Sequence, residues 1–162
     1  RVRVREVLGA LEHSLDWWLL GRIASMAVVG LLTWLGLVAL QVPVALTLAI
    51  LAALLSFVPN LGPILSAIPA VLVGLSQSPY TALYVLILYV VVQTVESYLI
   101  TPLIQRRAVL LPPALVLTMQ LVFALLFGFL GLLLATPLTV ILVVIVKMLY
   151  LRDRLGEEVD LP

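Results

Sequence analysis

One carboxylate stands out in a long apolar sequence, because Glu96 is the only acidic residue between positions 17 and 152. Gln93 precedes it by three residues, so both side chains would lie on the same face of a helix. An ionisable group inside a membrane segment is costly, and it usually faces a cavity or a charged partner. We consider two interpretations of Glu96: a proton- or cation-coupling carboxylate, or a structural ion pair with Arg106 or Arg107.

A second candidate site is the sequence Pro59-Asn60-Leu61-Gly62-Pro63, which interrupts the apolar stretch 42–75. Its prolines and glycine leave backbone N–H and C=O groups without helical partners. In hydrocarbon, such groups survive only inside protein or beside a water-filled cavity. The segment is therefore either part of a substrate path or a buried turn in which Asn60 caps the following helix.

The composition places these residues in a membrane protein. The 162 residues are 64% hydrophobic and 10% charged, with a mean hydropathy of +1.29, whereas about 25% of the residues in a soluble domain are charged. A net charge of +1 makes nucleic acid a poor partner. Without cysteine and with one histidine, the chain offers no thiolate nucleophile and no His-rich metal centre. We find no nucleophile–base set, so we predict neither an enzyme nor a cofactor.

The candidate residues would be positioned by a series of helical segments. We expect an amphipathic interfacial helix at 1–19, a span at 20–40, a broken hairpin at 44–75, a span at 80–101, a second broken hairpin or helix pair at 112–150, and a cytoplasmic tail at 151–162. Each arm of the first hairpin is shorter than the roughly 20 residues that a crossing needs, which favours a re-entrant hairpin. The predicted fold is a single transmembrane domain, an all-α polytopic bundle of full spans and two broken, re-entrant hairpins.

The second break contains Gly128 and Gly131. These glycines either form the tip of the second hairpin or let two helices pack closely. The order of a long span, a proline turn and a broken helix pair occurs at 23–75 and again at 80–146. This order resembles a degenerate internal repeat, a common feature of transporters.

The basic residues predict how the chain is oriented in the membrane. All nine Lys and Arg residues fall near the expected span ends on one side, and the turns at 41–43 and 76–79 carry no charge. The positive-inside rule then places both ends of the chain in the cytoplasm. The chain begins with Arg1 rather than Met, and we expect it to be the C-terminal part of a longer protein.

Three ordered blocks resemble the autoinducer-2 exporter family of bacterial permeases. They are Phe57-Val58-Pro59-Asn60-Leu61-Gly62-Pro63-Ile64-Leu65-Ser66-Ala67-Ile68-Pro69-Ala70, then Gln93-Thr94-Val95-Glu96-Ser97-Tyr98 with Thr101-Pro102-Leu103-Ile104, and Gly128-x-x-Gly131 with Leu134-Ala135-Thr136-Pro137. The resemblance covers nearly the whole chain, but only the C-terminal half of the usual family length. It implies a multi-spanning, typically oligomeric protein of the bacterial inner membrane that exports a small polar signal or exchanges sodium or lithium for protons.

We therefore predict a secondary transporter whose partners are membrane lipids, a small polar solute or monovalent cation, and further copies of the same chain. The alternative is a structural or scaffolding membrane protein that transports nothing. The residues predicted to form the substrate or ion path are Pro59, Asn60, Gly62, Pro63, Gln93, Glu96, Gly128 and Gly131.

Overall fold

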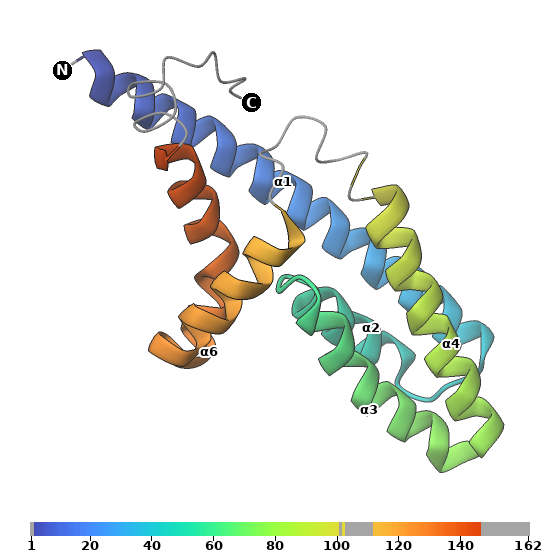
Figure 1. Ribbon diagram of the computed structural model, residues 1–162. Coiled ribbons are helices and arrows are strands. Elements are labelled where there is room, and N and C mark those ends of the chain that lie inside the picture. Colours follow the sequence, from blue (N-terminus) through green and yellow to red (C-terminus); the bar gives the residue numbers. More distant parts are fainter. Residues whose placement is uncertain (1, 101, 103–111, 147–162) are drawn as a thin grey trace. The chain divides into compact units, whose positions relative to one another are not determined.

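The computed structural model describes residues 2–100, 102 and 112–146, whose regular elements are all helical (Figure 1). The helices are α1 (Val2–Ala39), α2 (Ala45–Leu55), α3 (Leu61–Gln77), α4 (Pro79–Val95), the π-helix η1 (Glu96–Ile100) and α6 (Pro113–Val146). Three stretches are long and apolar enough to cross a membrane: Leu15–Ala39, Pro79–Ile100 and Ala114–Val146. The predicted all-α membrane fold is confirmed for this part of the chain. The predicted tail at 151–162 lies outside the described residues.

Two compact units make up the chain. One is Gly21–Ile104, and the other combines Arg1–Leu20 with Gln105–Pro162. In the first unit, α3 packs along both α2 and α4 (Figure 1). Its buried core is aliphatic around one tyrosine, and includes Leu37, Val42, Leu48, Ala52, Ala70, Val85 and Tyr89. The large apolar side chains on the outside of these helices are exposed, as expected for surfaces that face lipid.

Helix α1 is continuous where the sequence suggested two elements. The expected boundary between 1–19 and 20–40 is not a break, because the helix runs from Val2 through Gly21 to Ala39. A glycine inside a helix costs about 1 kcal/mol, less than the several kcal/mol of an unpaired backbone group in hydrocarbon. The helix ends where Gln41 adopts a positive φ of 55°. There the Val42 N–H donates to the Leu37 carbonyl at 3.0 Å, as in the Schellman motif.

The first hairpin consists of α2, α3 and the turn between them. The end of α3 is linked to the turn that precedes α2, because the Gln77 side chain donates to the Gln41 carbonyl oxygen at 3.0 Å. The next helix starts at once, with Ser78 as its N-cap accepting from the Thr81 N–H at 3.0 Å. Pro79 follows at the first helical position, where its missing N–H costs nothing. The predicted sharp turn at 76–79 is therefore present.

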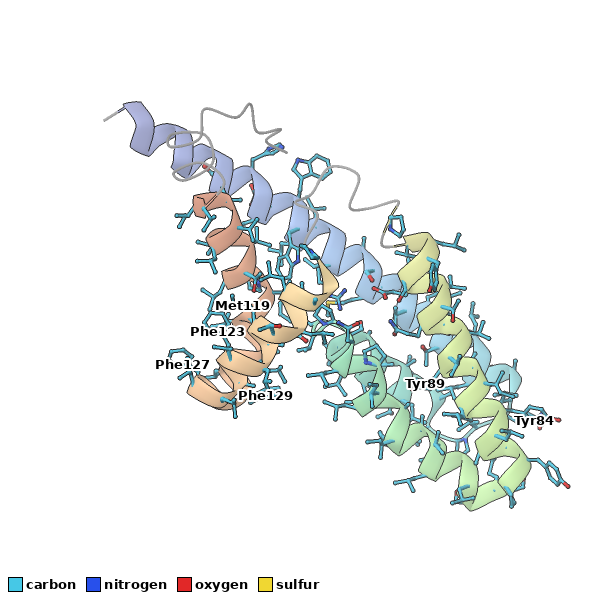
Figure 2. All side chains as sticks on the ribbon, viewed as in Figure 1. Tyr84, Tyr89, Met119, Phe123, Phe127 and Phe129 are labelled. Atoms are coloured by element: carbon cyan, nitrogen blue, oxygen red, sulfur yellow. The ribbon has the colours of Figure 1, made fainter. Side chains whose placement is uncertain are left out.

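The second hairpin is α6, which bends at Gly128 and folds back on itself (Figure 1, orange and red). Gly128 has φ 61° and ψ −141°, a region open almost only to glycine. A Cβ on Gly131 would overlap the carbonyl oxygen of Phe123 in the first arm. Figure 2 shows Phe123, Phe127 and Phe129 gathered around this bend, with the rings of Phe123 and Phe127 stacked at 6.3 Å between centroids. The predicted break is thus present, with Gly128 making the bend and Gly131 allowing the close packing.

Candidate functional site

The tip of the first hairpin, defined as residues 56–60, is a tight turn held by its own backbone. The Val58 N–H donates to the Leu55 carbonyl at 3.0 Å, and the Gly62 N–H donates to the Val58 carbonyl at 3.0 Å. Gly62 is buried, and a Cβ there would overlap the carbonyl oxygen of Leu55. Helix α3 therefore begins directly against the last carbonyls of α2, which only a glycine permits.

Asn60 occupies the N-cap position of α3, but its side chain makes no capping hydrogen bond. It is exposed and has φ 67°, a positive value that Asn tolerates better than most residues. Pro63 lies in the first turn of α3, where a proline needs no helical partner for its nitrogen. The interpretation of Asn60 as a helix-capping side chain is therefore not supported, although the turn is where we predicted it.

Glu96 is buried, with a relative exposure of 7%, and its carboxylate accepts bonds from two helices. Ser25 Oγ on α1 donates to Oε1 at 2.7 Å. Gln93 Nε2, one turn earlier on α4, donates to Oε2 at 3.2 Å. Arg22 Nη1 lies 3.4 Å from Oε1 and completes an ion pair. A buried carboxylate needs such compensation, because removing one partner of a buried pair costs about 3–5 kcal/mol.

Arg22 also reaches the tip of the first hairpin, where its Nε donates to the carbonyl oxygen of Phe57 at 3.1 Å. This carbonyl follows the end of α2, where backbone acceptors lack helical partners and the helix dipole is negative. One guanidinium thus joins α1, the tip and the start of η1. Sequence reasoning missed Arg22 and Ser25 as site residues. The available signal was that Arg22 and Glu96 are the only cation and the only anion between positions 21 and 104.

The backbone changes at Glu96, where α4 gives way to the π-helix η1. A π-helix shifts each hydrogen bond by one residue, and such segments often occur at functional sites. Two further polar side chains lie on the face of α4 that leads to Glu96. Gln93 lies one turn before Glu96, and Tyr89 lies one turn before Gln93, buried between α4 and the first hairpin (Figure 2). The Tyr89 hydroxyl has no hydrogen-bond partner among the described residues.

The structure brings together most of the predicted site residues. Gln93 and Glu96 lie in the same unit as Pro59, Asn60, Gly62 and Pro63, and Arg22 links the two groups. Gly128 and Gly131 belong to the other unit. In the described part of the chain, Glu96 forms an ion pair with Arg22. Arg106 and Arg107, the partners considered from the sequence, lie outside the described residues.

The oxygen atoms of the site are suited to hold a positive charge. The oxygens of Glu96 and Phe57 converge on the Arg22 guanidinium, and carboxylate and carbonyl oxygens suit protons and hard cations. Among residues 2–100, 102 and 112–146, no three or more His, Cys, Asp or Glu side chains cluster as a metal site would require.

Comparison with known proteins identifies the family. The model of the AI-2E family of transporters matches residues 1–151. The chain belongs to the AI-2E transporter family. It is similar to the AI-2 transport protein TqsA of Escherichia coli (strain K12), with 32% identity over 140 residues that cover 84% of this chain and 41% of TqsA. It is also similar to the "Putative transport protein YueF" of Bacillus subtilis (strain 168), with 30% identity over 89% of this chain and 40% of YueF.

Family membership and the three apolar helices make this chain a multi-pass bacterial membrane protein of a transporter family. The chain spans only about 40% of the length of the relatives it matches. The resemblance inferred from the blocks around Gly62, Glu96 and Gly131 is confirmed.

Proposed function

We propose that this AI-2E family chain forms part of a secondary transporter in which Glu96 is the coupling group. The observation that carries the proposal is a buried carboxylate, compensated by Arg22, beside the tip of a broken apolar hairpin. Broken helices at membrane depth are how many transporters build solute and ion sites. Release of Arg22 would let Glu96 take a proton or a cation in place of the guanidinium.

The first hairpin is proposed to be re-entrant. Helix α2 has 11 residues, or about 16 Å of length at 1.5 Å per residue, against about 30 Å of hydrocarbon. The bond from Gln77 to the Gln41 carbonyl supports placing both outer ends of the hairpin on one side. We further propose that both ends of the chain are cytoplasmic, from the distribution of its basic residues, and that the transporter is a homo-oligomer.

Two substrate classes fit a site whose one carboxylate could bind a proton or a cation. Because the relative TqsA is named an AI-2 transport protein, AI-2, a small polar signal, is the first candidate. Exchange of sodium or lithium for protons is the second, and the lone carboxylate at position 96 favours it. In both cases the described hairpin would move relative to the helices that hold it, exposing the site to each side of the membrane in turn.

Thiol labelling tests this proposal against the alternative of a scaffold whose breaks only allow close packing. We expect Asn60→Cys to react with a charged, membrane-impermeant maleimide, because a transport path at the tip is hydrated. Ile68→Cys, on the same helix and 54% exposed in the chain, is the matched control and should stay protected by lipid. This chain contains no cysteine of its own. Complete protection of Asn60→Cys would support the scaffold and contradict the path.

A further inference from the structure

The tip of the first hairpin depends on a residue that belongs to neither of its helices. Arg22 on α1 donates one bond to the Phe57 carbonyl and makes one ion pair with Glu96, from two different nitrogen atoms. Guanidinium is planar and presents several donors in a fixed geometry, so it can hold two acceptors at once. Both contacts therefore depend on the same orientation of the Arg22 side chain.

The two contacts of Arg22 are coupled by burial. Its side chain is only 12% exposed, and that of Glu96 is 9% exposed. A buried cation without a counter-charge is costly, and a long arginine side chain can turn toward water instead. Neutralising Glu96 would thus favour an outward orientation of Arg22, in which the bond to the Phe57 carbonyl is lost.

In the described part of the chain, the groups that bond the Glu96 carboxylate include Arg22 and Ser25 from α1, and Gln93 from α4. Ser25 and Gln93 are uncharged, and positions 21–104 contain no other charged residue and no histidine. Among residues 21–104, Arg22 is therefore the charged residue that pairs with Glu96.

We propose that Arg22 is a positioning residue that fastens the tip of the first hairpin to α1 only while Glu96 is negatively charged. A proton or a cation that neutralises Glu96 releases Arg22 and with it the tip. The use of this release in a transport cycle rests on the proposed function, but the release itself is an equilibrium property that can be measured without any flux.

The test is a distance measurement by electron paramagnetic resonance on the full protein in lipid nanodiscs. Spin labels replace Leu31 on α1 and Ile64 at the start of α3, both exposed and outside the bonded cluster. The labelled protein with Arg22, Ser25 and Glu96 intact should give one narrow distribution of distances between the two labels. Glu96→Gln should shift part or all of the population to a longer distance, and Ser25→Ala, which removes a hydrogen bond but no charge, should leave the distance unchanged.

A double variant keeps the test informative if Glu96→Gln does not fold. Arg22→Met/Glu96→Gln leaves no buried charge, and should be monodisperse yet show the longer distance, because methionine cannot donate to the Phe57 carbonyl. Unchanged distances in Glu96→Gln, or in the double variant, would overturn the proposal even if transport is lost. Longer distances in a protein that moves no solute would uphold the role of Arg22 and contradict the proposed function instead.

Discussion

Gly62→Ala is expected to destabilise the protein by at least about 2 kcal/mol, because the new methyl group would overlap the Leu55 carbonyl. Backbone atoms cannot move aside as a flexible side chain can, so α3 would have to shift away from the end of α2. The shift would also carry the tip away from Arg22. We expect a lower melting temperature and loss of transport in the same variant.

The matched control is Gly9→Ala, the same chemical change in α1 at a position where a Cβ would meet nothing within 4 Å. Alanine is favoured over glycine in a helix by roughly 0.5–1 kcal/mol, so this variant should melt at the same or a slightly higher temperature. Thermal unfolding of both purified variants in the same detergent measures the difference. Equal melting temperatures would contradict the close packing that we describe at Gly62.

Glu96→Gln is expected to have the second large effect. It removes the counter-charge that keeps Arg22 buried, and with it the contact of Arg22 with the hairpin tip, and should lower the free energy of unfolding by about 3 kcal/mol. It should also abolish solute-coupled proton movement, because glutamine cannot take up and release a proton. Glu12→Gln, at an exposed position of α1, removes the same charge and should change neither property.

A second variant separates stability from coupling. In Arg22→Met/Glu96→Gln both charges are gone, and replacing a buried ion pair by uncharged groups is often neutral or stabilising. The melting temperature should therefore return toward that of the unsubstituted protein while transport stays absent. Recovery of transport in this double variant would show that Glu96 stabilises the fold and does no coupling.

The sequence was sufficient to predict a helical fold for the described residues and the two breaks within the hairpins. Prolines and glycines in apolar stretches have strong local consequences, so the turn at Pro59–Pro63 and the bend at Gly128 could be placed from the residues alone. The boundary predicted between 1–19 and 20–40, in contrast, lies inside a continuous helix. Unpaired backbone groups are costly in hydrocarbon, so the helix continues through this point.

The ion pair of Glu96 with Arg22 could not be predicted for a different reason. Arg22 and Glu96 are 74 residues apart, and their contact depends on how α1 packs against α4. Gly36 shows how close that packing is, because a Cβ there would overlap the Leu88 side chain. Sequence proximity points to Arg106 and Arg107 instead, and by itself Arg22 indicates only the topology of the first span. Local patterns give no register between distant helices.

Solute flux through the purified protein is the most direct test that Glu96 couples transport. Proteoliposomes that contain the full protein and a pH-sensitive dye would be supplied in turn with AI-2, sodium and lithium. We predict either uptake of AI-2 or a change of internal pH driven by sodium or lithium. Protein-free vesicles and vesicles that contain the Glu96→Gln variant should show neither. Rates equal to the protein-free leak for all three solutes, or equal rates with and without Glu96→Gln, would contradict the account.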